Sequence, residues 1–234
     1  GRNWEQIRTT IAYNDRKVVI VGSHAGVSVG PDGGSHQALE DIALMRAMPN
    51  MDVVSPCDAI EAEKATIALS KTKGPAYLRL AREKTPIITT KETPFKMEKG
   101  EIYWIPEVGL AQVGIIVTGA LIYQALVAAK ELEVEGVKTK VLNLSSIKPI
   151  DKDAILNLAK ETKALVTVEE HQIAGGMGSA IAEIVVKNYP VPMEFIGVHD
   201  KFGQSGTAKE LIEHYGLDKN SIKEAIKKVL KRKI

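Results

Sequence analysis

Short apolar runs rich in β-branched residues alternate with amphipathic helical segments along almost the whole chain. The runs that predict strands lie at residues 17–23, 52–55, 76–80, 113–118, 138–144, 164–169 and 193–198. Most of them are followed by a segment whose apolar residues recur three or four positions apart, the spacing of a helix face. Strands that alternate with helices pair in parallel, with helices on both faces of the sheet. The sequence therefore predicts an α/β fold, in which the first run is a strand buried on both faces.

Capping residues mark where the helices begin and end. The predicted N-caps are Ser35, Asp58, Asp151 and Thr207, and Glu61 and Glu210 stand three residues after their caps. Gly136 and Gly216 are predicted to end two helices. Gly175, Gly176 and Gly178 precede another helix, where they favour close helix packing over the binding of an anion.

A proline-containing stretch without periodicity divides the chain. Residues 83–108 contain Pro86, Pro94 and Pro106 among threonines and charged residues, which is typical of a linker and an entry hairpin. A length of 234 residues allows two domains that each bury a core. We therefore expect two consecutive α/β domains with mainly parallel sheets. Their expected limits are 1–90 for the first domain, 91–108 for the linker and 109–234 for the second domain.

The charge and cysteine content argue against several classes of protein. Lysines and arginines number 31 against 29 acidic residues, which gives no reason to expect a nucleic-acid surface, and the lysine-rich end from Lys223 to Lys233 indicates a solvated helix face. Cys57 is the only cysteine, so we expect a small buried hydrophobe and neither a disulfide framework nor a thiolate metal cluster. No apolar stretch is long enough to span a bilayer and no secretory signal opens the sequence. A cytoplasmic protein that acts on small molecules is expected.

The sequence enters a helical pattern directly after Gly1. Trp4, Ile7 and Ile11 share one face of this pattern, and no strand or capping residue precedes it. We therefore expect that sequence upstream of Gly1 is missing. The chain would then be a fragment, a subunit of a split enzyme that is trimmed at its front, or part of a longer polypeptide.

The loop after the first predicted strand concentrates side chains that suit ligand binding. Its sequence from 23 to 41 is SHAGVSVGPDGGSHQALED, with His24, Asp32 and His36 among four glycines. Ligands of parallel α/β sheets bind beyond the carboxyl ends of the strands, so this loop and the one after Leu80 are candidate sites. Imidazoles transfer protons near neutral pH and carboxylates accept hydrogen bonds from hydroxyl groups, which favours a polyhydroxylated anionic substrate such as a sugar phosphate. The alternative is that the histidines only complete turns, and their spacing matches no metal-ligand pattern.

Three further stretches extend the pattern of this loop. They read MRAMPNMDVVSPCDAIEAEKA at 45–65, VEEHQIAGGMGSA at 168–180 and FGQSGTAKELIEHYGL at 202–217. Together with the loop, in which a first histidine, an Asp-Gly step and a Ser-His-Gln step follow the strand, they resemble the transketolase family. The resemblance is colinear over nearly the whole chain. It implies the second half of a pyrimidine-binding domain followed by the transketolase C-terminal domain.

The resemblance also implies roles for individual residues. His36 corresponds to the catalytic histidine close to the reactive carbon of the cofactor, where it assists proton transfer. His24 and Arg82 correspond to residues that contact the substrate phosphate, and Asp32 to one that recognises a substrate hydroxyl. A guanidinium at a strand end suits phosphate oxygens. Arg79, by contrast, is interpreted as a surface or interface charge.

The resemblance implies thiamine diphosphate and Mg²⁺ as cofactors, held mainly by portions that would lie upstream of Gly1. In the family, a glutamate from that upstream part activates the thiamine. The cofactor contacts of this chain are therefore unknown, no metal ligands are expected in it, and the chain is expected to be inactive alone. We expect an N-terminal transketolase subunit or portion as partner, in a homodimer or heterotetramer, and neither nucleic acid nor membrane. The implied reaction transfers a two-carbon ketol unit between sugar phosphates, as in the pentose phosphate pathway.

Some features leave alternatives open. Ala25, Gly26 and Pro31 depart from the family pattern, which loosens the match to any one donor sugar but keeps the three polar side chains of the loop. The alternative enzymes are 1-deoxy-D-xylulose-5-phosphate synthase and the beta component of a 2-oxoacid dehydrogenase. His24 favours transketolase, because the synthases usually lack a histidine at that position. A non-catalytic dimerisation module is the alternative from another class of protein.

Overall fold

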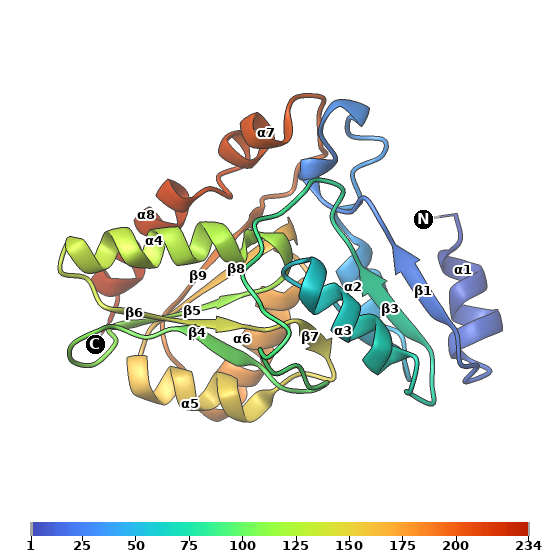
Figure 1. Cartoon of the computed structure of the whole chain (residues 1–234), viewed down its shortest axis with the longest axis horizontal. Coiled ribbons are helices and arrows are strands. Elements are labelled where there is room, and N and C mark those ends of the chain that lie inside the picture. Colours follow the sequence, from blue (N-terminus) through green and yellow to red (C-terminus); the bar gives the residue numbers. More distant parts are fainter. Residues whose placement is uncertain (1, 234) are drawn as a thin grey trace.

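The computed structural model describes residues 2–233 and contains two mostly parallel sheets flanked by helices (Figure 1). The first sheet has the order β1 (Val19–Gly22), β3 (Ala76–Arg79), β2 (Asp52–Val54) and β7 (Ser146–Lys148). The second has the order β4 (Glu101–Trp104), β6 (Thr139–Asn143), β5 (Val113–Val117), β8 (Leu165–Gln172) and β9 (Met193–Val198). All neighbours are parallel except β2 with β7 and β4 with β6. The predicted α/β fold with two mainly parallel sheets is confirmed.

Helices cover these sheets, and their bounds follow in chain order. They are α1 (Trp4–Gln6), α2 (Asp41–Arg46), α3 (Ala59–Leu69), α4 (Ile122–Val134), α5 (Lys152–Thr162), α6 (Met177–Asn188), α7 (Ala208–His214) and α8 (Lys219–Lys231). Three further helical segments are the π-helix η1 (Ile7–Ala12) and the 3-10 segments η2 (Val27–Asp32) and η3 (Gly119–Leu121). On the second sheet, α4 and α8 cover one face and α5 and α6 the other, while α7 reaches over to η2 (Figure 1). Among residues 2–233, no helix is both long and apolar enough to cross a membrane.

The position of β1 differs from the prediction that the first strand is buried on both faces. Within residues 2–233, β1 pairs with β3 alone and forms the edge of the first sheet. Val21 is 53% exposed as a result. The prediction was wrong because β-branched composition reports strand propensity and does not tell an edge strand from a central one.

Two strands pair with strands from outside their own part of the predicted domain arrangement. β7 follows the second sheet's strand β6 in the chain, yet it pairs antiparallel with β2 and completes the first sheet. β4 lies inside the stretch expected to be a linker and pairs antiparallel with β6 at the edge of the second sheet. The two sheets are therefore built from interleaved parts of the chain.

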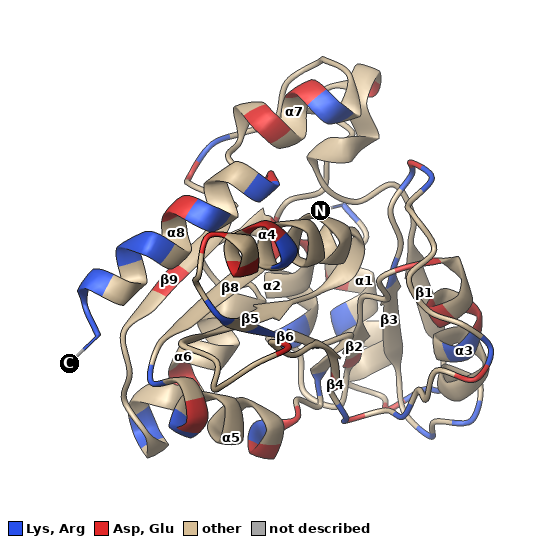
Figure 2. Cartoon of the chain, turned by 60° about the vertical axis from the view of Figure 1, so that its left-hand side comes forward, with Lys and Arg blue, Asp and Glu red and all other residues tan. Residues whose placement is uncertain are grey.

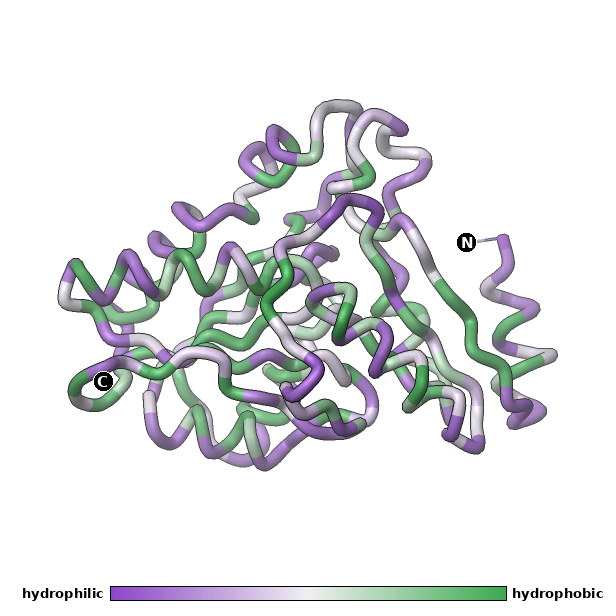
Figure 3. Tube along the Cα trace, viewed as in Figure 1, coloured by the Kyte–Doolittle hydropathy of each residue, from purple (hydrophilic) through white to green (hydrophobic). Residues whose placement is uncertain are grey.

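The hydrophobic cores also cross the junction between the sheets. One cluster joins Ile42 and Tyr77 of the first half with Leu165 of β8. A second cluster fills the space between the second sheet, α4 and α8, and it includes Val27 and Leu39, both at most 1% exposed. Figure 3 shows the apolar residues along the strands and the polar ones along the outer loops and helix surfaces. Each such buried side chain contributes roughly 1.5–3 kcal/mol, so the loop that carries Val27 is anchored in the second domain's core.

The N-cap predictions are confirmed at three of four positions, with side-chain caps at Asp58, Asp151 and Thr207, the last in a full capping box with Glu210. The prediction for Ser35 was wrong. Helix α2 begins at Asp41, and the Ser35 hydroxyl lies 3.1 Å from Nδ1 of His36 instead. The residues between are not helical because Ala38 forms a bridge with Ala25 and accepts a hydrogen bond from Gly26 N–H.

The lysine-rich last helix is connected to its neighbours by ion pairs. Lys223 of α8 pairs with Glu131 of α4 and with Glu135, the C-cap of that helix, and Lys228 pairs with Glu194 of β9 at 2.7 Å. Figure 2 shows this run of lysines along α8, with acidic residues on the neighbouring elements. The helix face is solvated as predicted, but the acidic neighbours neutralise much of its charge.

The start of α3 combines several hydrogen bonds on one carboxylate. Asp58 caps the helix at Glu61 N–H and also accepts from Ile88 N–H at 2.7 Å and Thr89 N–H at 2.6 Å. Although burial acts in the opposite direction, these donors lower the pKa of Asp58. The Glu61 carboxylate accepts a hydrogen bond from Cys57 N–H. Cys57 is buried, as the sequence predicts, and burial raises the pKa of its thiol.

We expect Asp58→Ala to lower the free energy of unfolding by about 2–3 kcal/mol, because it removes a helix cap and leaves a part-buried and a buried N–H group without an acceptor. Urea unfolding followed by circular dichroism measures the change. Glu63→Ala on the exposed side of the same helix is the control, with an expected change within about 0.5 kcal/mol. Equal effects of the two substitutions would contradict this role of Asp58.

Candidate active site

The loop between β1 and α2 lies beyond the carboxyl ends of β1 and β3, where the sequence predicts a ligand site (Figure 1). Ala25 N–H donates to the Leu80 carbonyl at 3.1 Å, which ties the start of the loop to the segment that follows β3. Parallel strands end at the same edge, so side chains from the two loops meet there. We refer to residues 23–40, which the sequence predicts to bind a substrate, as the substrate loop.

Asp32 and Arg82 are brought together by this arrangement. Arg82 Nη1 lies 3.3 Å from Asp32 Oδ1 and donates to the Val29 carbonyl at 2.7 Å. Both side chains remain exposed to solvent. A guanidinium at the surface that contacts a carboxylate and keeps further N–H groups available is suited to a hydroxylated, phosphorylated ligand.

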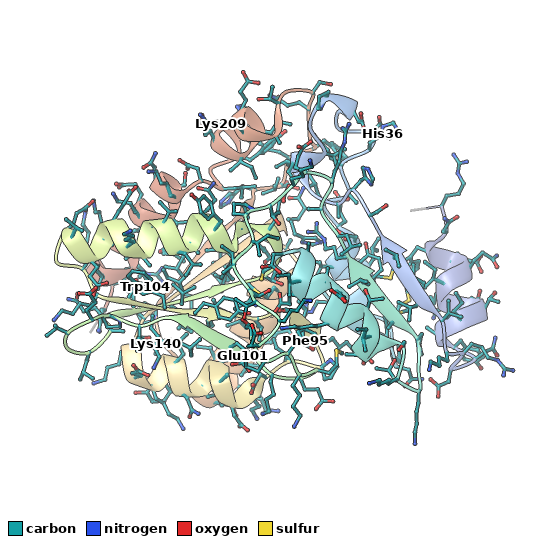
Figure 4. All side chains as sticks on the ribbon, in the orientation of Figure 1. His36, Phe95, Glu101, Trp104, Lys140 and Lys209 are labelled. Atoms are coloured by element: carbon teal, nitrogen blue, oxygen red, sulfur yellow. The ribbon has the colours of Figure 1, made fainter. Side chains whose placement is uncertain are left out.

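The two loop histidines stand on either side of Asp32 in the sequence and are both exposed. His36 Nδ1 lies 3.1 Å from the Ser35 hydroxyl, and Figure 4 shows His36 near the tip of the loop at the top of the molecule. His24 has a φ of 62°, which costs a residue with a side chain roughly 1–2 kcal/mol. Such strain is found preferentially at functional positions. Within residues 2–233, no hydrogen bond joins either histidine to Asp32 or Arg82.

Two cavities lie near the carboxyl edge of the first sheet, and only the second is lined by a residue of the substrate loop. The first, of about 490 Å³, lies at the ends of β2 and β3 and is lined by Arg82 together with Pro56, Cys57 and Ala120. Its lining does not include His24, Asp32 or His36. The second, of about 430 Å³, lies between the loop, α4 and α7 and is lined by Ser28 and Glu170 among others. Of the four predicted site residues, Arg82 alone therefore both contacts the loop, through Asp32, and lines one of these two cavities.

A buried ion pair lies beneath the substrate loop. Arg79 Nε donates to Asp41 Oδ2 at 2.7 Å, and the hydroxyl of Tyr77 donates to the same oxygen at 2.7 Å. Burial acts to raise the pKa of Asp41, but the neighbouring guanidinium outweighs it and holds that pKa below its ordinary value. Of the predicted surface or interface charge at Arg79, the surface position was wrong. Arg79 is 6% exposed because its side chain points between β3, α2 and β8.

His171 is fully buried next to this ion pair and is held in its neutral form. Its Nε2 accepts from Ala43 N–H at 3.4 Å, and its Nδ1 lies 2.6 Å from the Gln172 carbonyl, where it must donate. One acceptor and one donor are what the neutral imidazole offers. Burial, followed by the charge of Arg79, lowers the pKa of His171 to about 4.

The glycine-rich start of α6 surrounds the carboxyl group of Glu169. Glu169 accepts hydrogen bonds from Met177 N–H at 2.7 Å and Gly178 N–H at 2.8 Å. A Cβ on Gly176 would lie 2.3 Å from Glu169 Oε2, so glycine is required there for the carboxylate to approach. Burial raises the pKa of Glu169 to about 7, against the effect of these two donors. The close packing predicted for these glycines is thus packing around a carboxylate at a helix N-terminus.

Sequence reasoning assigned no role to Glu169, which bonds to the start of α6, or to Glu170, which bonds to Ser28 of the substrate loop. The sequence did contain a signal for them, because these two adjacent acidic residues lie at the end of an otherwise apolar predicted strand. Charged residues are seldom fully buried unless they are paired. Two glutamates in one buried strand therefore indicate specific partners.

The fold is that of a two-domain α/β protein, and exposed histidine and aspartate side chains lie at the carboxyl edge of its first sheet. In proteins of this class, ligands bind in the loops beyond the strands. Comparison with known families is specific: "Transketolase, pyrimidine binding domain" matches residues 1–87 and "Transketolase, C-terminal domain" matches residues 107–222.

Known proteins resemble the chain over almost its whole length. A "Putative transketolase C-terminal section" of Methanocaldococcus jannaschii is 41% identical over 99% of this chain and 72% of that protein. A subunit of the apulose-4-phosphate transketolase of Phocaeicola vulgatus is 36% identical over 95% of this chain and 70% of that protein. A solved structure described as "Split gene transketolase, inactive beta4 tetramer" superposes with a TM-score of 0.92 at 39% identity, over 100% of this chain and 74% of that one. The chain belongs to the transketolase family, as a carboxyl-terminal section that contains the pyrimidine-binding and C-terminal domains and is similar to the subunits of split transketolases.

We expect Asp41→Ala to reduce the free energy of unfolding by about 3–5 kcal/mol, because it leaves the Arg79 guanidinium buried without its counter-ion. The exposed ion pair between Arg46 and Glu183 offers a control, since Glu183 is 68% exposed. Glu183→Ala should change stability by less than about 1 kcal/mol. Urea unfolding of both variants at pH 7 measures the difference, and a small effect of Asp41→Ala would contradict the importance of the buried pair.

His171 makes a pH-dependent contribution with a definite sign. Because its pKa is lowered from 6.5 to about 4 on folding, the stability that it contributes is fully present above about pH 6.5 and is lost as the pH falls through about 4. The difference in unfolding free energy between the native protein and His171→Asn should therefore shrink between pH 7 and pH 5. A difference that stays constant over this interval would show that His171 does not change its pKa on folding.

Proposed function

We propose that this chain is the carboxyl-terminal component of a thiamine-diphosphate-dependent transketolase, which transfers a two-carbon ketol unit from a ketose phosphate to an aldose phosphate. The observation that carries the proposal is the pair of Asp32 and Arg82, side by side and exposed at the carboxyl edge of the first sheet. The exposed histidines on the same loop and membership of the family support it.

Each side chain of the site has a role in this proposal. Arg82 and His24 bind the phosphate of the sugar, for which the forked guanidinium offers N–H groups not used by Val29. Asp32 accepts a hydrogen bond from a hydroxyl group near the reacting carbon. His36, which is exposed, transfers protons at the reacting oxygen. The chain thereby orients the sugar and moves protons on it.

Thiamine diphosphate supplies the carbanion-stabilising chemistry when it is bound. Within residues 2–233, no group of three or more His, Cys, Asp or Glu side chains is arranged to hold a metal ion. We propose that another polypeptide segment holds the diphosphate and its Mg²⁺. His36 is the residue of this chain that we place nearest the cofactor.

A complementary subunit is part of the proposal. The relative from Phocaeicola vulgatus is by its name one subunit of a transketolase for apulose 4-phosphate, and the relative of solved structure is described as an inactive tetramer of beta chains. We propose that this chain likewise needs a subunit that completes the cofactor site, and that its substrate belongs to the ketose phosphates. Residues 1–90 then carry the sugar-binding loop and residues 109–234 the C-terminal domain, joined by 91–108.

Isolated protein should show no ketol transfer when it is supplied with thiamine diphosphate, Mg²⁺, a ketose phosphate and an aldose phosphate. Addition of the complementary subunit should give turnover, and His36→Ala in the reconstituted enzyme should reduce kcat by roughly 100-fold, the usual contribution of a proton-transfer group. The matched control is His214→Ala on the exposed surface of α7, which should retain activity.

Two results would contradict this function. Turnover by the isolated chain would show that the cofactor site is complete without a partner. Replacement of His24, Asp32 and Arg82 without loss of sugar-phosphate binding or of reconstituted activity would favour the non-catalytic dimerisation module.

A further inference from the structure

The second domain holds the substrate loop along much of its length. Near the end of the loop, Gln172 N–H of β8 donates to the Leu39 carbonyl at 2.9 Å. Gln37 Nε2 donates at 3.0 Å to the carbonyl of Gln204, in the segment before α7. Figure 1 shows this segment and α7 beside the loop at the top of the molecule. The loop is therefore attached to two parts of the chain that are far from it in sequence.

The middle of the loop is held by a carboxylate of the second domain. Glu170, on β8 and 4% exposed, accepts a hydrogen bond from Ser28 N–H at 2.6 Å. Ser28 lies halfway between His24 and Asp32 in the chain. A hydrogen bond this short to a carboxyl oxygen that is itself buried is among the stronger contacts available to a backbone N–H. The position of the loop thus depends on a residue 142 positions away.

The backbone next to this bond is shaped to the same carboxylate. Gly26 has a φ of 91°, and a Cβ at this position would lie 2.3 Å from Oε1 of Glu170. The turn after His24 is consequently built in contact with Glu170, with room for a hydrogen atom and nothing larger.

The burial of Glu170 is unusual if its function is to stabilise the fold. Within residues 2–233, no cation lies close enough to its carboxylate to form an ion pair, and Arg79 donates to its backbone carbonyl instead. The charge of Arg79 acts on this carboxyl group only from beyond ion-pair distance. Its burial therefore remains costly, whereas an apolar side chain would fill the same volume without that cost. What the carboxylate provides and an apolar side chain does not is an acceptor for the loop.

We infer that Glu170 is a positioning residue of the transketolase reaction. By bonding to Ser28, it sets where His24 and Asp32 stand relative to Arg82, and so governs how well the site binds the phosphorylated donor. This inference rests on the proposed function and extends it, because it gives the C-terminal domain a direct part in organising the sugar site.

Hydrogen exchange tests the first half of the inference without reference to activity. In Glu170→Ala, the amides of residues 26–32 should exchange at least about tenfold faster than in the native chain, because the loop loses its central acceptor. Glu170→Gln keeps an oxygen acceptor and should exchange at nearly the native rate. Glu194→Gln is the control, since Glu194 is a carboxylate of the same sheet that pairs with Lys228 and does not touch the loop.

Steady-state kinetics of the chain reconstituted with its complementary subunit test the second half. For Glu170→Ala we expect KM for the ketose phosphate donor to rise about tenfold or more with a smaller fall in kcat, and for Glu170→Gln to restore most of the loss. A residue that only stabilises the fold would lower the amount of active enzyme, and hence kcat, at an unchanged KM. Gly26→Ala, which pushes the loop away from an intact Glu170, should reproduce the rise in KM even if Glu170→Ala does not fold.

The outcomes separate this inference from the proposed function. If the native reconstituted protein transfers no ketol group, the proposed function fails, while the exchange data still decide whether Glu170 holds the loop. If native activity is present but Glu170→Ala and Gly26→Ala leave both loop exchange and KM unchanged, the positioning role is overturned. Faster exchange spread evenly over both domains would overturn it as well.

Discussion

The buried ion pair between Arg79 and Asp41 joins the three elements that meet beneath the substrate loop. Arg79 ends β3, Asp41 begins α2, and the same guanidinium donates to the Glu170 carbonyl of β8 at 2.9 Å. A charge removed from water must keep its partner, because an unpaired one costs several kcal/mol. The three elements therefore hold one another in a single relative position, and the carboxyl edge of the first sheet is fixed against the second sheet.

The loop above this pair illustrates how a stable scaffold supports exposed chemistry. Its inward side is anchored by Val27 in the second domain's core and by Glu170 at the middle of its backbone. Its outward side presents His24, Asp32 and His36 to solvent. The role that we propose for this loop needs both properties, since side chains must reach the ligand while their backbone stays in place. These two requirements explain why the C-terminal domain is packed so closely against the pyrimidine-binding domain.

Local patterns predicted much of this molecule correctly, and the errors have a common cause. The caps at Asp58 and Asp151 depend on contacts three residues away, so the sequence reveals them directly. Ser35 has the same cap chemistry, but Ala38 is held extended by its bridge to the far side of the loop. Arginine is usually found at the surface, but Arg79 is buried because folding brings its partner Asp41, 38 residues away, beside it. Each error concerns a contact that is distant in the chain.

The sequence by itself determined the alternation of strands and helices, the loop with its two histidines and Asp32, and the resemblance to transketolase, because these follow from residue types and short spacings. Only the tertiary structure decided that β7 completes the first sheet and that Asp32 meets Arg82. It also decided that Glu170 bonds to the substrate loop across 142 positions. Such pairings depend on how two sheets pack, and packing is a property of the whole chain that no local pattern encodes.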